Sequence, residues 1–180
     1  ATPTLALGVE YPGLIAIAEN LYSSEAPPYY LESTVAHEVG HQWFYNLVGN
    51  DEVDAPWLDE SLVQYITGLY YRDAYGTSAE ASYRASWDSR WARIDRAAIP
   101  IGRPSGSYAA NEYSPVIYGR GPYFFAALEE ELGPGRMEDF LRNYFQTNQW
   151  GLGTGAALRD AAERQCGCDL GELFAGWGDD

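Results

Sequence analysis

The feature that most constrains this chain is the five-residue motif His37-Glu38-Val39-Gly40-His41, which holds both histidines of its 180 residues. On a helix, side chains at positions i and i+4 project from the same face, so two imidazoles can bind one ion. A motif of this kind arises by chance in roughly one of a few hundred chains of this length. The alternative, two unrelated surface histidines, does not explain why both lie within an otherwise apolar helix. We therefore expect a metal site.

A third ligand has to come from elsewhere in the chain, since catalytic zinc usually has three protein ligands. Glu60 is the candidate, because it follows His41 after 18 residues and lies early in the next predicted helix. Two antiparallel helices joined by a short loop would bring its carboxylate opposite the two imidazoles. Asp59 and Asp54 are competing acids, which near a helix N-terminus also have a purely electrostatic role beside the helix dipole.

Hydrophobic spacing predicts a mostly helical body after about residue 33. Apolar stripes at helical spacing predict one helix from Ser33 to near Gly49 and a second from Pro56 to Gly76. Glycine and proline are dense over residues 97–116, which indicates a long loop of the kind that is often functional. Further helices are expected over residues 78–94, 122–132, 137–144, 155–165 behind a Thr154 cap, and 169–177.

The first twenty residues predict strands. Leu5, Leu7 and Val9 alternate with smaller residues, and a turn at residues 11–13 leads to a second short strand over residues 14–17. Two strands alone are marginal in water, so we expect them to pair with a sheet outside this chain or with another copy. The expected fold class is α+β, mostly helical, with a short N-terminal β element.

The charge balance narrows the range of partners. There are 26 acidic residues against 11 basic ones, all arginine, so the net charge is −15. Such a chain repels phosphate backbones, and nucleic-acid binding is not expected. No apolar run is long enough for a transmembrane segment. The chain begins with Ala1 and has no methionine before Met137, so we expect a longer parent chain. Its compartment is left open.

Cys166 and Cys168 are separated by a single glycine. Two cysteines make no disulfide framework, and a bridge between them would close a strained ring. We expect two reduced thiols near a helix end, with a metal or redox role as the alternative.

Two stretches, HEVGHQWFYNLVG and WLDESLVQY, resemble the M1 family of zinc aminopeptidases, with its pattern HExxH-x18-E. The resemblance implies one zinc ion bound by His37, His41 and Glu60, with Glu38 as general base. It also implies a fragment of a thermolysin-like zincin catalytic domain, whose preceding N-terminal domain is missing. Within the partial domain of residues 1–180 we expect a strand element over 1–20, a zinc-binding helix pair over 33–76 and a helical subdomain over 77–180.

Two further residues belong to this resemblance. Tyr118, within SPVIYGRG, is similar to the family tyrosine that hydrogen-bonds the tetrahedral intermediate. The family signature GxMEN is poorly kept in Leu7-Gly8-Val9-Glu10-Tyr11, where only Glu10 matches. Glu10 resembles the acid that binds the substrate α-amino group. An exposed glutamate at a strand end is the alternative interpretation.

The function implied is zinc-dependent removal of N-terminal amino acids from peptides with a free N-terminus. The altered segment around Glu10 leaves open an endopeptidase of the same zinc class. A non-catalytic zinc-bearing scaffold is the third interpretation, although a scaffold has no need of Glu38. We also expect that the fragment alone can be inactive while its site is intact.

Overall fold

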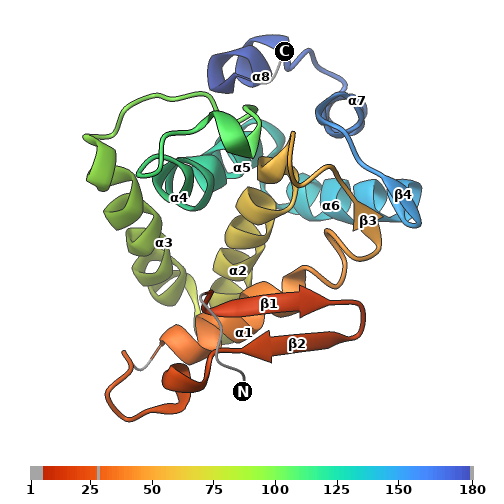
Figure 1. Cartoon of the computed structure of the whole chain (residues 1–180). Helices are drawn as coiled ribbons and strands as arrows, with labels where there is room; N and C mark the ends of the chain where they lie inside the picture. Colours follow the sequence, from red (N-terminus) through yellow and green to blue (C-terminus); the bar gives the residue numbers. More distant parts are fainter. Residues whose placement is uncertain (1–5, 28, 179–180) are drawn as a thin grey trace.

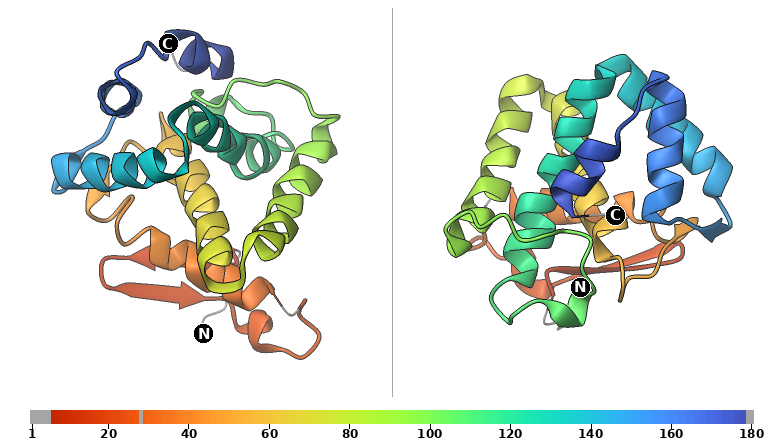
Figure 2. Two further views of the ribbon diagram at one scale, coloured as in Figure 1. Left: turned by 180° about the vertical axis from the view of Figure 1, so that it is seen from behind. Right: turned by 90° about the horizontal axis from the view of Figure 1, so that it is seen from above.

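The computed structural model describes residues 6–27 and 29–178, in which helices predominate (Figures 1 and 2). The α-helices are α1 (Tyr30–Gly40), α2 (Glu60–Tyr75), α3 (Thr77–Trp91), α4 (Tyr113–Pro115), α5 (Gly121–Leu132), α6 (Pro134–Asn148), α7 (Gly155–Cys166) and α8 (Gly171–Trp177). Shorter 3-10 turns are η1 (Glu19–Tyr22), η2 (Pro56–Leu58), η3 (Ala92–Ile94) and η4 (Ser105–Ser107), and η5 (Val116–Arg120) is a π-helical turn. The strands are β1 (Gly8–Tyr11), β2 (Leu14–Ile17), β3 (Val48–Gly49) and β4 (Gly151–Leu152).

The strands β1 and β2 form an antiparallel hairpin that lies along α1 (Figure 1). Glu10 is paired with Ile15 across the hairpin, and Gly13 takes a positive φ in the turn between the strands. Ile15 and Ile17 pack in a small apolar cluster with Leu31 and Val35 of α1. The two strands therefore pair with each other, and pairing with a further sheet stays a prediction. The expected strand position at Leu5 lies outside the described residues.

The first predicted helix was too long. It ends at Gly40 and not near Gly49. The carbonyl oxygen of His41, which would accept from the N–H of Tyr45 in a continued helix, instead accepts two hydrogen bonds from Asn46. The backbone N–H and the side-chain amide of Asn46 both donate to that carbonyl, at 3.0 and 3.1 Å. Apolar spacing reports which side chains are buried, but it does not report such local hydrogen bonds, of which the one from the Asn46 side chain competes with continuation of the helix.

The later elements follow the sequence predictions within a few residues. Helix α2 ends where Gly76 adopts a φ of 90°, and Thr154 caps α7 by accepting from the N–H of Ala157 at 3.1 Å. The loop predicted over residues 97–116 holds no helix apart from η4 as far as residue 112, but it ends earlier than predicted, because α4 begins at Tyr113 and η5 at Val116. The helix predicted over 137–144 is longer, since Pro134 fits the first turn of α6 and provides an earlier start.

The expectation for the cysteines was wrong. Cys166 and Cys168 are joined by a disulfide, with Cα atoms 5.2 Å apart. That separation lies within the ordinary range for disulfides. It arises because Gly167 takes a left-handed conformation at the end of α7 and turns the chain back on itself.

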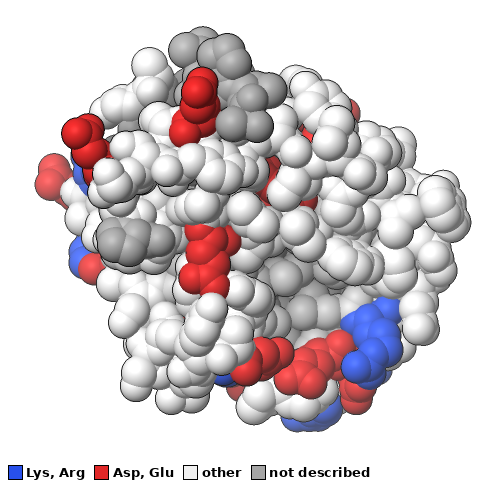
Figure 3. Space-filling view, turned by 90° about the horizontal axis from the view of Figure 1, so that it is seen from below, with Lys and Arg blue, Asp and Glu red and all other residues white. Residues whose placement is uncertain are grey.

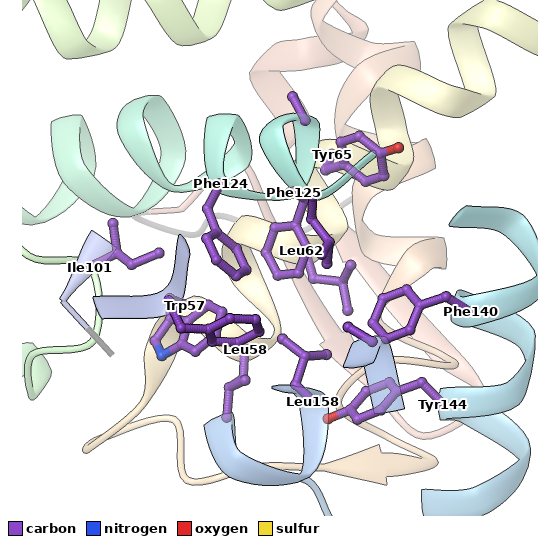
Figure 4. Packing of buried hydrophobic residues seen from close by; sticks show 14 of the residues in the cluster. Trp57, Leu58, Leu62, Tyr65, Ile101, Phe124, Phe125, Phe140, Tyr144 and Leu158 are labelled. Atoms are coloured by element: carbon purple, nitrogen blue, oxygen red, sulfur yellow. The ribbon is translucent and has the colours of Figure 1, made fainter. Parts of the chain in front are cut away.

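Helix α2 runs through the middle of the molecule and organises its core (Figures 1 and 4). Trp57, just before α2, is fully buried, and its ring meets Phe124 of α5 edge to face at 5.3 Å between centroids. Leu62 and Tyr65 of α2 lie in the same cluster, which extends to α6 and α7. The core thus fixes α2 against α5 and leaves the N-terminal end of α2 facing α1.

Charged groups lie mostly at the surface. The face seen from below in Figure 3 carries more acidic than basic side chains, in keeping with the acidic composition. Over the described part of the chain, no helix combines the length and apolar character needed to cross a membrane.

The core position of Trp57 gives a test of the fold. Trp57→Ala should lower the free energy of unfolding by about 3–5 kcal/mol, because it removes a fully buried ring and leaves a cavity. Trp150→Ala is the matched control, since that ring is 82% exposed, and it should change stability by less than about 0.5 kcal/mol. Urea unfolding followed by circular dichroism measures both, and equal effects would contradict the packing described.

Candidate metal centre and active site

Three side chains converge where α1 and α2 meet: one from α1, one from the residue that directly follows it, and one from the start of α2. The Nε2 atoms of His37 and His41 lie 3.1 Å apart. An Oε2 of Glu60 lies 3.0 Å from the first and 3.3 Å from the second. The helical spacing of the histidines and the first position of Glu60 on α2 produce this convergence. Two imidazoles and one carboxylate are a donor set typical of catalytic zinc sites, so these residues fit that ion.

The turn after α1 orients one of the imidazoles. His41 Nδ1 lies 3.2 Å from the carbonyl oxygen of Phe44, to which it can donate. A proton on Nδ1 leaves the lone pair of Nε2 free toward Glu60, which is how metal-binding histidines are commonly held. The early end of α1 is therefore useful, because it brings that carbonyl back to His41.

Close packing brings the two helices together beside these ligands. A side chain at Gly40 would meet Cγ1 of Val63 at 2.9 Å, so the absence of one lets α1 approach α2. Asp59 is buried and accepts from the N–H of Glu60 at 2.8 Å, which holds the first turn of α2. Asp54 is exposed. Of the competing acids, neither joins the groups of potential ligands found in the described residues.

The charges at this cluster respond to burial and to each other. Burial is the largest effect on His37 and lowers its pKa, although the hydrogen bond to Glu60 opposes it. Burial also acts to lower the pKa of His41, but the hydrogen bond and the charge of Glu60 outweigh it and raise that pKa to about 9. The two histidines lower the pKa of Glu60 against its own burial. Positive charge is thus favoured beside this carboxylate, whether a proton or a bound cation provides it.

Two further acids, Glu10 and Glu38, lie close to His41. Burial is the main cause that raises the pKa of Glu38 to about 8, and the nearby charge of Glu10 adds to it. Glu10, Glu38 and His41 offer ligand atoms within 4.8 Å of one another. The structure therefore contains two overlapping sets of potential ligands that share His41. The set with Glu10 has two carboxylates and one imidazole, a harder donor set than the other.

Gly8 explains how Glu38 fits beside the hairpin. A Cβ atom on Gly8 would overlap the carboxylate and Cγ of Glu38. Strand β1 therefore passes Glu38 without a side chain at this position, and Glu10 follows two residues later on the same strand. Gly8 was not identified from the sequence. The one available signal was that a residue without a side chain lies two positions before Glu10.

Tyr118 reaches the cluster from the π-helical turn η5. Its ring centroid lies 6.1 Å from that of His37. Burial, followed by the charge of Glu60, raises the pKa of its hydroxyl well above the ordinary value. The turn is fastened to α2, since the hydroxyl of Ser61 donates to the carbonyl of Ile117 at 2.6 Å. Ser61 follows Glu60 directly, so the same turn of α2 places both Glu60 and Tyr118.

An open cavity of about 250 Å³ adjoins Glu60. Its lining includes Tyr113, whose ring centroid lies 6.2 Å from that of Tyr118, and Ser105 of the predicted functional loop. The complete lining is Glu52, Val53, Pro56, Asp59, Glu60, Ser105 and Tyr113. Sequence reasoning missed Tyr113, because it is one of fifteen tyrosines and nothing in its spacing separates it from packing residues.

The family model described as the peptidase family M1 domain matches residues 8–177. The chain belongs to peptidase family M1. Both the predicted resemblance and the predicted fold class are confirmed.

Individual relatives are distant and longer. Aminopeptidase N of Lactobacillus helveticus is 27% identical over 154 residues, which cover 81% of this chain and 18% of that protein. Aminopeptidase RNPEPL1 of Mus musculus is 26% identical over 188 residues, covering 95% of this chain and 26% of that protein. The chain thus spans about a fifth to a quarter of the length of these relatives.

Among solved structures, a point mutant of an M1 zinc metallopeptidase from Deinococcus radiodurans bound to a Tyr-Ser-Ala substrate is similar, with a TM-score of 0.74 and 22% identity. The match covers 98% of this chain and 37% of that one. At this identity the likeness concerns the fold.

The two overlapping ligand sets can be separated by metal binding. Glu60→Gln should weaken Zn²⁺ binding by at least about 100-fold, since even partners outside the ligand set commonly cost 10- to 100-fold. Glu10→Gln is the matched control and should bind Zn²⁺ as the wild type does. Isothermal titration with Zn²⁺ at constant pH measures both. Loss of binding in Glu10→Gln with retention in Glu60→Gln would assign the ion to the other set.

Proposed function

We propose that this chain carries the zinc centre and the catalytic base of an aminopeptidase, which removes residues from the free N-terminus of peptides. The observation that carries the proposal is the convergence of His37, His41 and Glu60. Membership of family M1 supports it. The relatives named above are themselves called aminopeptidases.

The proposed metal-binding residues are His37, His41 and Glu60, which would hold one zinc ion. A bound zinc ion would polarise the scissile carbonyl and lower the pKa of the attacking water. The remaining chemistry falls to side chains around this centre.

Glu38 is proposed as the general base. It follows His37 on α1 and is only 5% exposed, and a carboxylate oxygen lies within 4.8 Å of a ring nitrogen of His41. In this role it takes a proton from the attacking water and then returns it to the leaving amine. Tyr118 would donate a hydrogen bond to the oxyanion that develops on the carbonyl oxygen, a contact that stabilises the transition state.

Glu10 is proposed to bind the substrate ammonium group. It lies on β1 beside Glu38, where a carboxylate can accept charge-assisted hydrogen bonds from an N-terminal amine. Holding the amine there would place the first peptide bond of the substrate next to the general base. Cleavage would then be confined to the N-terminal residue, and an endopeptidase would lack this restriction.

The base assignment has a direct test. Glu38→Gln should retain Zn²⁺ and lose about 10²- to 10⁴-fold in kcat for a free amino-acid anilide, because the amide cannot accept the proton. Glu32→Gln, on the first turn of the same helix, is the matched control and should keep its activity. An active Glu38→Gln enzyme would contradict the assignment. Both are measured on the protein expressed from its complete reading frame.

The exopeptidase role can be tested by removing the charge that would bind the amine. Glu10→Gln should lower kcat/KM for the free anilide by about 10- to 100-fold, the range expected for one hydrogen bond to a charged group. The wild type should hydrolyse the N-acetylated anilide far more slowly than the free one. Equal rates on both would favour an endopeptidase, and no hydrolysis of either by the zinc-loaded protein would favour a scaffold.

A further inference from the structure

The side chain of Gln42 joins the end of the metal-binding segment to the hairpin turn. Its Nε2 donates to the carbonyl oxygen of Tyr11 at 3.1 Å, and its Oε1 accepts from the N–H of Gly13 at 2.8 Å. These partners lie 31 and 29 residues away in sequence. Because both ends of the amide have partners, its orientation is determined. A flipped amide would set its NH₂ group against the N–H of Gly13 and its oxygen against the carbonyl oxygen of Tyr11.

The two bonds act close to the proposed substrate-binding acid. Tyr11 follows Glu10 directly, so the peptide carbonyl that Gln42 binds lies one residue from it. At the other end, Gln42 follows His41, whose imidazole belongs to the metal cluster. One side chain therefore links the backbone beside Glu10 with the backbone beside His41.

Apolar packing supports a different part of the hairpin. Ile15 and Ile17 of β2 belong to the small apolar cluster that also includes Leu31 and Val35 of α1. On strand β1 itself, Gly8 lies against Glu38. Glu10 thus lies between two fixed points of the backbone, the close contact at Gly8 and the hydrogen bonds of Gln42 to Tyr11 and Gly13.

We propose that Gln42 is a positioning residue, which sets the distance of Glu10 from the metal cluster by anchoring the hairpin turn. This inference rests on the proposed function, in which Glu10 binds the substrate amine. Gln42 itself touches neither the substrate nor the ion in this role. Its loss should weaken recognition of the amine and leave metal binding intact.

The experiment compares Gln42→Met with the wild type. Methionine has a similar length and shape but can form neither hydrogen bond. Two inhibitors serve as probes, an amino-acid hydroxamate and the same compound without its α-amino group. In Gln42→Met, the inhibition constant of the amine-bearing compound should rise about 10-fold, while that of the other changes less than about 2-fold. Amide hydrogen exchange at Gly13 should become faster, because its N–H has lost its acceptor.

Gln165→Met is the matched control, since its amide oxygen also accepts a long-range hydrogen bond, from Asn143, but lies on α7 away from the hairpin. It should leave both inhibition constants and the exchange at Gly13 unchanged. Equal weakening of both inhibitors by Gln42→Met would mean general damage and would overturn the proposal. Faster exchange with no change in either constant would also overturn it.

Failure of the proposed function has a different signature. In that case the wild type would bind the two hydroxamates equally, and Glu10→Gln would have no effect on either. Faster exchange at Gly13 in Gln42→Met would then still establish the anchor, but its role in amine recognition would be excluded.

Discussion

The interaction on which the rest of the site depends is the contact of the Glu60 carboxylate with two imidazoles, that of His37 on α1 and that of His41 directly after it. A carboxylate is costly to bury unless positive charge and hydrogen bonds compensate it. Here the compensation comes from His37 and His41, and it is possible only because α1 and α2 approach closely at Gly40. The position of α2 is fixed in turn by the aromatic core around Trp57. A large part of the fold thus holds one carboxylate beside two nitrogen atoms.

How much could be predicted depended on the range of the interactions involved. The histidine pair was predictable because i, i+4 spacing is a local property of a helix. Glu60 was predictable from its place at the start of the next helix, but only with a competing acid beside it. In the structure, the side chain of Asp59 accepts a hydrogen bond from the N–H of Glu60 at the start of α2. Roles for these residues remain proposals, whereas their convergence is a feature of the structure.

The errors arose where a side chain or a glycine changes the path of the backbone. The end of α1 depends on Asn46, and the disulfide depends on the left-handed conformation of Gly167. Neither effect appears in hydrophobic periodicity, which reports burial and not turn geometry. Tyr118 presents a related case, because the bond between Ser61 and Ile117 that holds its turn joins residues 56 positions apart. Only the resemblance to a family could single it out from the other tyrosines.

Gly8 imposes a constraint of an unusual kind on the hairpin. Its φ is not among the positive values that favour glycine, so it is needed for its small volume and not for backbone freedom. The strand could form equally well with alanine there, and β-propensity would even favour the change. What forbids it is the carboxylate of Glu38 on the neighbouring helix. Strand β1 therefore gives up intrinsic sheet stability to leave room for an acid, and its sequence is shaped by the chemistry opposite it as much as by its own folding.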